Sequence, residues 1–178
     1  MTTMQNLTLT ELNERFDEAL GSPTDPGRVE MIVVRPEHDI RETPNTVRVG
    51  AFGLEGDHWS TGEYRDEPDT QIAIISSRVI DLVARSRERW ALAGDNLVAD
   101  MDLSPENLPT GQRLEVGSAI LEITAIPHRG CAKFAARFGA DALRFVNVGR
   151  GGELRFRGVY ARVVQPGVIT TGDEIRKI

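Results

Sequence analysis

Hydrophobic and polar residues alternate along much of this chain with the two-residue period that is typical of β-strands. The strands predicted from this pattern are residues 29–35, 46–49, 71–75, 113–116, 118–126, 159–164 and a closing hairpin over 168–178 around Gly172-Asp173. Prolines, glycines and serines bound these runs, as expected where strands end in turns. The pattern therefore favours a strand-rich fold.

The clearest strand pair is predicted at residues 113–126. Gly117 stands between two alternating runs, and glycine at the first central position suits a tight two-residue turn. In the second run we expect Leu121 and Ala125 to face the core, while Thr124 faces solvent.

Two segments instead have the spacing of amphipathic helices. Within the first 20 residues, Thr8 and Glu11 form a capping-box pattern, and Gly21 marks the end of the helix. Residues 78–90 place apolar side chains on one stripe, with arginine and glutamate opposite. Both segments are predicted to pack on the strands through their apolar faces.

Strands outnumber helices, and the connections are too short for repeated crossover helices. We therefore expect an α+β fold that is mainly β, a mostly antiparallel barrel or sandwich with peripheral helices. Residues 22–27 carry two prolines and are predicted to be a linker. The chain is thus divided into an N-terminal helix with its linker, residues 1–28, packed on a domain over residues 29–178.

The composition is that of an ordinary globular protein, with 40% hydrophobic and 27% charged residues among 178. A net charge of −6 argues against the broad positive field that nucleic-acid binding needs. The single cysteine excludes an internal disulfide and a cysteine-based structural zinc site. No run is long and apolar enough to span a membrane, and the N-terminus lacks the order of a signal peptide. We expect a cytoplasmic protein that binds neither nucleic acid nor membrane.

The one thiol, Cys131, is the leading candidate for chemistry. Apolar residues recur three, four and seven positions after it, as on one face of a short helix. In the first turn of that helix, unpaired backbone N–H groups and the charges of His128, Arg129 and Lys133 would lower the pKa of the thiol. A thiolate attacks sulfur or binds a soft metal, whereas a buried cysteine is only a small hydrophobic residue. The spacing alone leaves both readings open.

Further polar residues stand where loops are predicted. Asp57 and His58 follow a glycine, as do Asp95 and Asn96, and each pair suits either a ligand-binding loop or an ordinary turn. Arg150 lies in a glycine-rich stretch without the ending of a phosphate-binding P-loop. We interpret this stretch as a flexible loop that is able to swing Arg150 over a bound anion. 

Arg162 is predicted to face away from its apolar neighbours, towards a pocket or towards solvent. No serine stands in a nucleophile elbow, and the histidines lack the spacing of a helical zinc pair.

Motifs with a fixed order and spacing run from about Val29 to the end of the chain. They are Gly53-Leu54-Glu55-Gly56-Asp57-His58, Gly94-Asp95-Asn96-Leu97, Asp102-Leu103, Leu114-Glu115-Val116-Gly117, His128-Arg129-Gly130-Cys131-Ala132-Lys133-Phe134, and Gly158-Val159-Tyr160-Ala161-Arg162-Val163 with Gly167 and Gly172-Asp173. This ordered set resembles the MOSC domain, named for the C-terminal domain of molybdenum cofactor sulfurases.

The resemblance implies a closed β-barrel that binds the molybdenum cofactor, molybdopterin. In that family the conserved cysteine is thought to ligate molybdenum or to carry sulfur as a persulfide, and Cys131 stands at its position. Cofactor-binding roles are then expected for Asp57, His58, Asp95, Asn96, His128, Arg129, Lys133, Arg150 and Arg162. The leading hypothesis is an oxidoreductase that reduces N-hydroxylated or N-oxide compounds, and the alternatives are persulfide transfer on Cys131 and non-catalytic carriage of the cofactor.

The chain departs from the family pattern at several positions. Asp95 stands where many members have glutamate, Gly130 where proline is common, and His58-Trp59 where short members often have an Arg-His type pair. The pyridoxal-phosphate desulfurase domain of the full sulfurases is absent, so no pyridoxal phosphate is expected. Sulfur would come from a separate cysteine desulfurase, and electrons from a separate electron-donor reductase.

Overall fold

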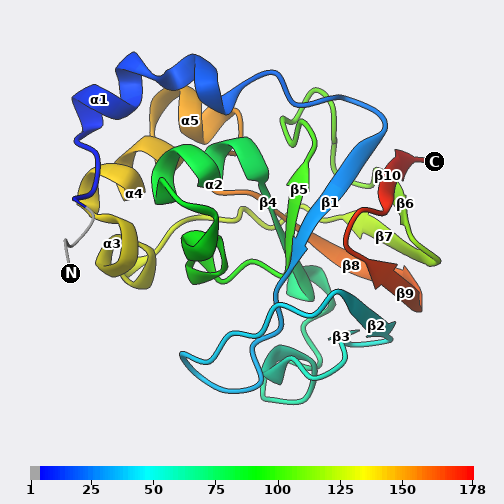
Figure 1. The fold of residues 1–178 in the computed structure, drawn as a ribbon. Coiled ribbons are helices and arrows are strands. Elements are labelled where there is room, and N and C mark those ends of the chain that lie inside the picture. The colour runs from blue at the N-terminus through cyan, green and yellow to red at the C-terminus, as the bar shows by residue number, and fades with distance from the viewer. Residues whose placement is uncertain (1–4) are drawn as a thin grey trace.

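The computed structural model describes residues 5–178, and its centre is a closed barrel of seven strands (Figure 1). Around the barrel the strands follow the order β1, β10, β6, β7, β8, β4 and β5, and β5 closes it against β1. Their bounds are β1 Gly27–Ile32, β4 Ile72–Ser76, β5 Leu97–Asp100, β6 Arg113–Val116, β7 Ala119–Ile123, β8 Val159–Gln165 and β10 Glu174–Lys177. Neighbouring strands are antiparallel except for β4 and β5. The expected α+β fold on a closed, mostly antiparallel barrel is confirmed.

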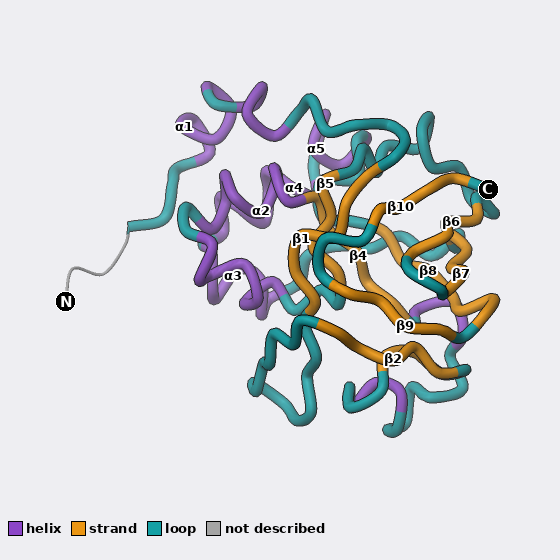
Figure 2. Tube along the Cα trace, turned by 45° about the vertical axis from the view of Figure 1, so that its right-hand side comes forward, coloured by secondary structure: helices purple, strands orange, loops and turns teal. Residues whose placement is uncertain are grey.

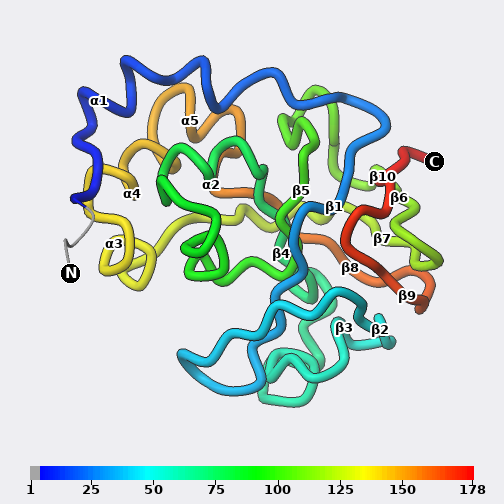
Figure 3. Tube along the Cα trace, in the orientation of Figure 1, coloured from blue at the N-terminus to red at the C-terminus, as the bar shows by residue number. Residues whose placement is uncertain are grey.

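A small sheet lies beside the barrel, in the order β3 (Gly53–Leu54), β2 (Thr46–Gly50) and β9 (Gly167–Thr170). The predicted closing hairpin over residues 168–178 is therefore wrong, because β9 pairs with β2 while β10 pairs with β1 and β6. A tight turn, closed by the Asp173 amide donating to the Thr170 carbonyl at 3.0 Å, carries the chain from one sheet to the other. Figure 3 shows the consequence, with β1 and β10 from opposite ends of the chain lying side by side.

Helices α1 to α5 gather on one side of the barrel (Figure 2). Their bounds, with those of the short 3₁₀ helices, are α1 Leu9–Glu14, η1 Phe16–Ala19, η2 His58–Ser60, η3 Pro68–Thr70, α2 Ser77–Ala84, η4 Arg87–Ala93, α3 Ala132–Phe138, α4 Ala140–Asn147 and α5 Gly149–Glu153. Along residues 5–178, no helix combines the length and hydrophobicity of a membrane span.

Two hydrophobic clusters hold these layers together, and strands β4 and β5 contribute to both. Ile74 and Leu97 lie in the barrel interior, whereas Ile75 and Val98 pack outward against the helices. A strand covered on both faces has no polar side, which explains why every residue of β4 is buried. The connection between these parallel strands passes through α2 and η4 on the outside of the barrel.

Two of the predicted helices are each divided into an α-helix and a 3₁₀ helix. The capping box of Thr8 and Glu11 is confirmed, but the α-helix ends at Glu14 and continues only as η1, and residues 1–4 of the prediction lie outside the described part. Likewise residues 78–90 form not one helix but α2 and then η4, because Arg85 between them adopts a left-handed φ of +63°.

Two local predictions are wrong. The glycine-rich stretch around Arg150 is helix α5 and not a flexible loop. Gly151 lies close against the Phe145 carbonyl oxygen, and a side-chain carbon added at this glycine would lie only 1.9 Å from that oxygen. In the predicted 113–126 pair, β6, β7 and the Gly117 turn are confirmed, but β7 ends at Ile123. Thr124 is therefore buried, donating its hydroxyl to the Asp69 carbonyl at 2.7 Å, and Ala125 is exposed.

Candidate functional site

A pocket of about 340 Å³ opens beside the ends of β1, β5, β7 and β8 and is bounded by α3. Ligand pockets in proteins usually measure some 300–1,000 Å³, so this one is large enough for a small molecule. Its lining residues are Arg35, Glu37, His38, Asp39, Arg41, His58, Trp59, Tyr64, Thr70, Ala73, Ala93, Gly94, Asn96, His128, Arg129, Cys131, Lys133, Phe134, Arg137, Arg157 and Tyr160.

The lining is strongly cationic, although the whole chain carries a net charge of −6. Its basic residues are Arg35, Arg41, Arg129, Lys133, Arg137 and Arg157, against the acids Glu37 and Asp39. Positive charge concentrated in a cleft attracts and retains anions. The pocket therefore favours an anionic ligand.

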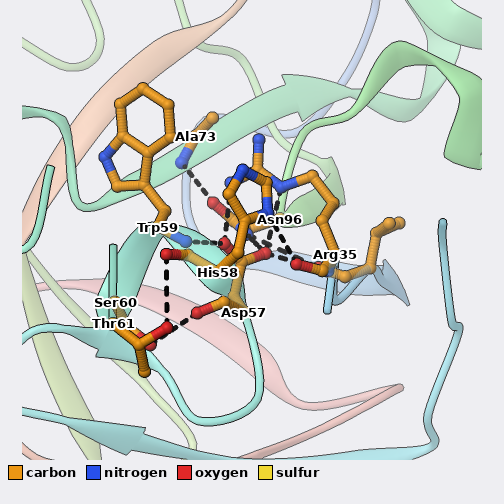
Figure 4. A network of polar contacts seen from close by, with 9 residues as sticks. Arg35, Asp57, His58, Trp59, Ser60, Thr61, Ala73 and Asn96 are labelled. Atoms are coloured by element: carbon orange, nitrogen blue, oxygen red, sulfur yellow. Dashed lines mark hydrogen bonds and ion pairs between the residues drawn. The ribbon is translucent and has the colours of Figure 1, made fainter. Parts of the chain in front are cut away.

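Asp57 accepts hydrogen bonds from several chain segments next to the pocket (Figure 4). Its carboxylate accepts hydrogen bonds from the Arg35 amide and guanidinium at 3.0–3.1 Å, from Asn96 Nδ2 at 3.1 Å and from the Trp59 amide at 3.0 Å. Asn96 Oδ1 in turn accepts from the Ala73 amide at 3.0 Å. Because Asp57 itself is buried, its role is to hold Arg35 and Asn96 at the pocket wall.

His58 stands directly after Asp57 and lines the pocket. Its Nδ1 lies 2.7 Å from the Arg35 carbonyl oxygen. Since a carbonyl only accepts, Nδ1 carries the proton and the ring is fixed in orientation. The His38 ring lies beside it, with the ring centres 5.1 Å apart.

Asp95 and Arg157 form a buried ion pair at the base of the pocket. Arg157 Nη1 donates to both carboxylate oxygens, at 2.9 and 2.7 Å, and Nη2 donates to the Ala93 carbonyl at 3.2 Å. Burial raises the pKa of the Asp95 carboxyl, an effect that the Arg157 guanidinium opposes. Asp95 thus anchors Arg157, and it is Arg157 that faces the pocket.

His128 is buried between this ion pair and Tyr160. Its Nδ1 lies 3.5 Å from Asp95 Oδ1, and its ring centre lies 4.2 Å from that of Tyr160. Burial, followed by the charges of Arg157 and Arg35, lowers the pKa of His128 well below its usual value, so the ring is neutral. Among residues 5–178, Nδ1 has no hydrogen-bond partner.

Cys131 is the N-cap of α3 and lies one position before the helical turn in which we expected it. Partial burial raises the pKa of its thiol, but the backbone N–H groups of Phe134 and Lys133 and the charges of Arg157 and Lys133 outweigh this and lower it. The side chain is exposed, while Phe134 is buried. The interpretation of Cys131 as a buried hydrophobic residue is therefore excluded.

The structure brings most of the predicted site residues together. His58, Asn96, His128, Arg129, Cys131 and Lys133 line the pocket, and Asp57 and Asp95 support it from beneath. Arg150 and Arg162 lie elsewhere. Arg150 covers the Phe16 ring at 4.3 Å, and Arg162 pairs with Glu122 and Asp69 on the outside of the barrel.

Several pocket residues escaped the sequence analysis. Arg157 immediately precedes the motif that begins at Gly158, and Arg35 ends the apolar run of residues 29–35. The neighbouring sequence could therefore have indicated both arginines as candidate site residues. Arg41 and Arg137 had none, because only the folded chain brings them together.

The family model for the MOSC domain matches residues 54–176, which is more than half of the chain. The chain belongs to the MOSC domain family. MOSC domains are associated with molybdenum cofactor binding. In this member of the family, the matched residues include Cys131, Arg157 and the motifs around Asp57 and Asp95.

Solved structures share the fold of this MOSC domain. The YuaD protein of Bacillus subtilis is 19% identical, with a TM-score of 0.64 over 84% of this chain and 94% of that one. YiiM of Escherichia coli is 18% identical (TM-score 0.56, 85% and 69% covered), and YiiM of Geobacillus stearothermophilus is 20% identical (TM-score 0.58, 86% and 75% covered). No curated protein matches the sequence at a significant level.

Proposed function

We propose that this MOSC domain binds the molybdenum–pterin cofactor in its cationic pocket and uses Cys131 as the protein ligand to molybdenum. The observation that carries the proposal is the exposed thiol with a lowered pKa at the N-cap of α3, facing the same pocket as Arg157. A thiolate is a ligand suited to soft metals, and guanidinium groups match phosphate oxygens. His128 also lines the pocket, and its neutral ring offers hydrogen-bonding atoms to a polar ligand ring.

Several pocket residues have roles that follow from their chemistry. Arg157, Arg129 and Lys133 hold the anionic parts of the cofactor, and His58 and His128 bind its polar ring edge. When bound, the cofactor supplies two-electron redox chemistry at molybdenum. Burial, together with the charge of Asp95, raises the pKa of Tyr160, so this phenol keeps its proton at the pocket lining.

We propose the reduction of N-hydroxylated or N-oxide compounds as the reaction. A hydroxylamine takes up two electrons and two protons, its N–O bond breaks, and an amine and water leave. A separate electron-donor reductase supplies the electrons. A thiol that remains free and exposed suits a reducing compartment, so we place the protein in the cytoplasm.

The test is to purify the protein from a molybdenum-replete host and to measure molybdenum by mass spectrometry and oxidised pterin by fluorescence. We expect near-stoichiometric amounts of both in the native protein. Cys131→Ala is expected to lose the metal, whereas Arg162→Gln, a change on the outside of the barrel, keeps it. Native protein that contains neither, and that cannot be loaded with added cofactor, would contradict the proposal.

Sulfur transfer is a second candidate, favoured by the exposure of Cys131. In this reaction the Cys131 thiolate attacks the outer sulfur of a desulfurase persulfide, and the desulfurase thiolate leaves. Incubation with a cysteine desulfurase and cysteine should then add one sulfur atom to Cys131, detected by peptide mass spectrometry. An unmodified Cys131 would exclude this function and leave cofactor binding, with or without turnover.

A further inference from the structure

Two arginines that have no assigned role converge at the pocket wall. Arg41 lies in the loop after β1, and Arg137 lies near the end of α3. A side-chain carbon placed on Gly94 would lie 3.7 Å from Arg41 Nη2 and 3.9 Å from Arg137 Nη1. The two guanidinium groups therefore border the same small space, which the missing side chain of Gly94 leaves open.

The charges at this point are not balanced. Asp39 lies 3.1 Å from Arg137 Nη2 and 4.0 Å from Arg41 Nη1, and its side chain is 79% exposed. The Arg41 side chain is only 13% exposed, and within residues 5–178 its buried Nε has no hydrogen-bond partner. Burial and the neighbouring Arg137 charge lower the pKa of Arg41, as expected for a cation short of counter-charge. One solvated carboxylate thus faces two guanidinium groups.

This arginine pair is separate from the thiol. Arg137 follows Cys131 by six positions along α3, which corresponds to about 9 Å at the rise of an α-helix. A ligand that reaches from Cys131 to the pair would span most of the length of α3. The pocket lining thus includes both the thiol and the arginine pair, and Cys131 and Arg137 come from the two ends of α3.

We infer that Arg41 and Arg137 form a subsite for an oxyanion of the phosphate class, carried by a ligand that occupies the pocket. Paired guanidinium groups present planar N–H donors that match the oxygens of a phosphate group. Asp39 occupies this position as an internal counter-ion, which an arriving phosphate displaces towards solvent. The inference is independent of the chemistry proposed for Cys131.

The test is calorimetric titration of the purified full chain with inorganic phosphate at low ionic strength. We expect saturable binding that weakens as salt is added. Arg41→Gln should weaken it about tenfold or more, because a hydrogen bond to a charged group contributes at least an order of magnitude to affinity. Arg48→Gln is the matched control, since Arg48 is 75% exposed and lies on β2 outside the pocket lining.

A second variant is expected to strengthen phosphate binding, where Arg41→Gln weakens it. Asp39→Asn removes the internal counter-ion while keeping a residue that tolerates the left-handed φ of +64° at this position. We expect it to bind phosphate more tightly than the native protein. Equal binding by Arg41→Gln and the native protein, weaker binding by Asp39→Asn, or no saturable binding in the native protein would overturn the inference.

Repeating the titration on protein loaded with molybdenum cofactor distinguishes two sources of the anion. If bound cofactor blocks inorganic phosphate, the subsite holds the phosphate of the cofactor. If the loaded protein still binds phosphate and Arg41→Gln still weakens it, the subsite receives a phosphorylated substrate.

Discussion

Arg157 contributes both to the stability of the protein and to the positive charge of the pocket. Its guanidinium holds the buried Asp95 carboxylate, and its charge contributes to lowering the pKa of Cys131. Both members of the ion pair are almost fully removed from solvent. A buried charge that loses its partner is costly, which makes this pair sensitive to substitution.

Arg157→Met should therefore destabilise the protein by about 3–5 kcal/mol, because Asp95 would be left without its counter-charge. Urea unfolding measures this change. Arg162→Met serves as the control, since Arg162 is 47% exposed and such surface pairs contribute at most about 1 kcal/mol. Similar losses in the two variants would contradict the importance of burial.

The pKa of Cys131 gives a second prediction for single residues. In cofactor-free protein, the rate of alkylation by iodoacetamide should rise with pH around a midpoint below that of an ordinary cysteine, because the folded protein favours the thiolate. Lys133→Gln removes a nearby positive charge and should move the midpoint to higher pH. Lys177→Gln, on β10, should leave it unchanged. A midpoint that does not respond to Lys133→Gln would show that the lysine charge does not act on the thiol.

Among the elements, the parallel pair of β4 and β5 organises the base of the pocket. The connection between them runs through α2 and η4 and returns to the barrel at Gly94. Asp95 and Asn96 follow directly, in the short segment before β5. On the other side of β4, strand β8 begins directly after Gly158, which has a φ of +109°. A side-chain carbon there would lie 2.1 Å from the Ile74 carbonyl and 3.3 Å from His128 Nδ1.

Gly158→Ala should consequently destabilise the fold more than Gly111→Ala. Both glycines have positive φ, so each substitution carries a backbone strain of about 1 kcal/mol. Gly111 has open space around it, whereas at Gly158 the clash with β4 should add about 1–3 kcal/mol. Thermal or urea unfolding of the two variants provides the comparison, and equal stabilities would contradict the close approach of β8 to β4.

At the scale of the whole molecule, the N-terminal helix packs into the second hydrophobic cluster. Leu12 is buried there, and the Phe16 ring centre lies 5.7 Å from that of Phe145 and 5.0 Å from that of Phe156. These contacts support treating α1 and the barrel as one cooperative unit. The division of the chain at residue 28 remains a prediction.

Leu12→Ala should lower the free energy of unfolding by about 2–5 kcal/mol, as for other large-to-small changes in cores, while the protein still unfolds in a single transition. The exposed Asn13→Ala is the control. A separate early transition for the helix, seen by circular dichroism in urea, would show that α1 is an independent appendage.

The sequence predicted much of the barrel because hydrophobic alternation reports which residues face a core. Alternation does not report which strands pair, so β9 and β10 were assigned to one hairpin although they belong to different sheets. For the site, residues within motifs, such as Cys131, Lys133 and Asn96, could be found from the chain alone. The arginine pair over Gly94 could not, because its members stand 96 positions apart (137 − 41) and only the tertiary structure joins them.

The hydrogen bonds around Asp57 have a thermodynamic consequence. They join the chain after β1, the start of β4 and the approach to β5, so the pocket wall exists only when the barrel has closed. Any molecule that binds there selects the native state from the unfolded ensemble by mass action, adding about 2.7 kcal/mol at a hundredfold excess over its dissociation constant. By the same linkage, a substitution that opens the barrel far from the pocket lowers occupancy, so the fraction of loaded protein reports on the integrity of the entire fold.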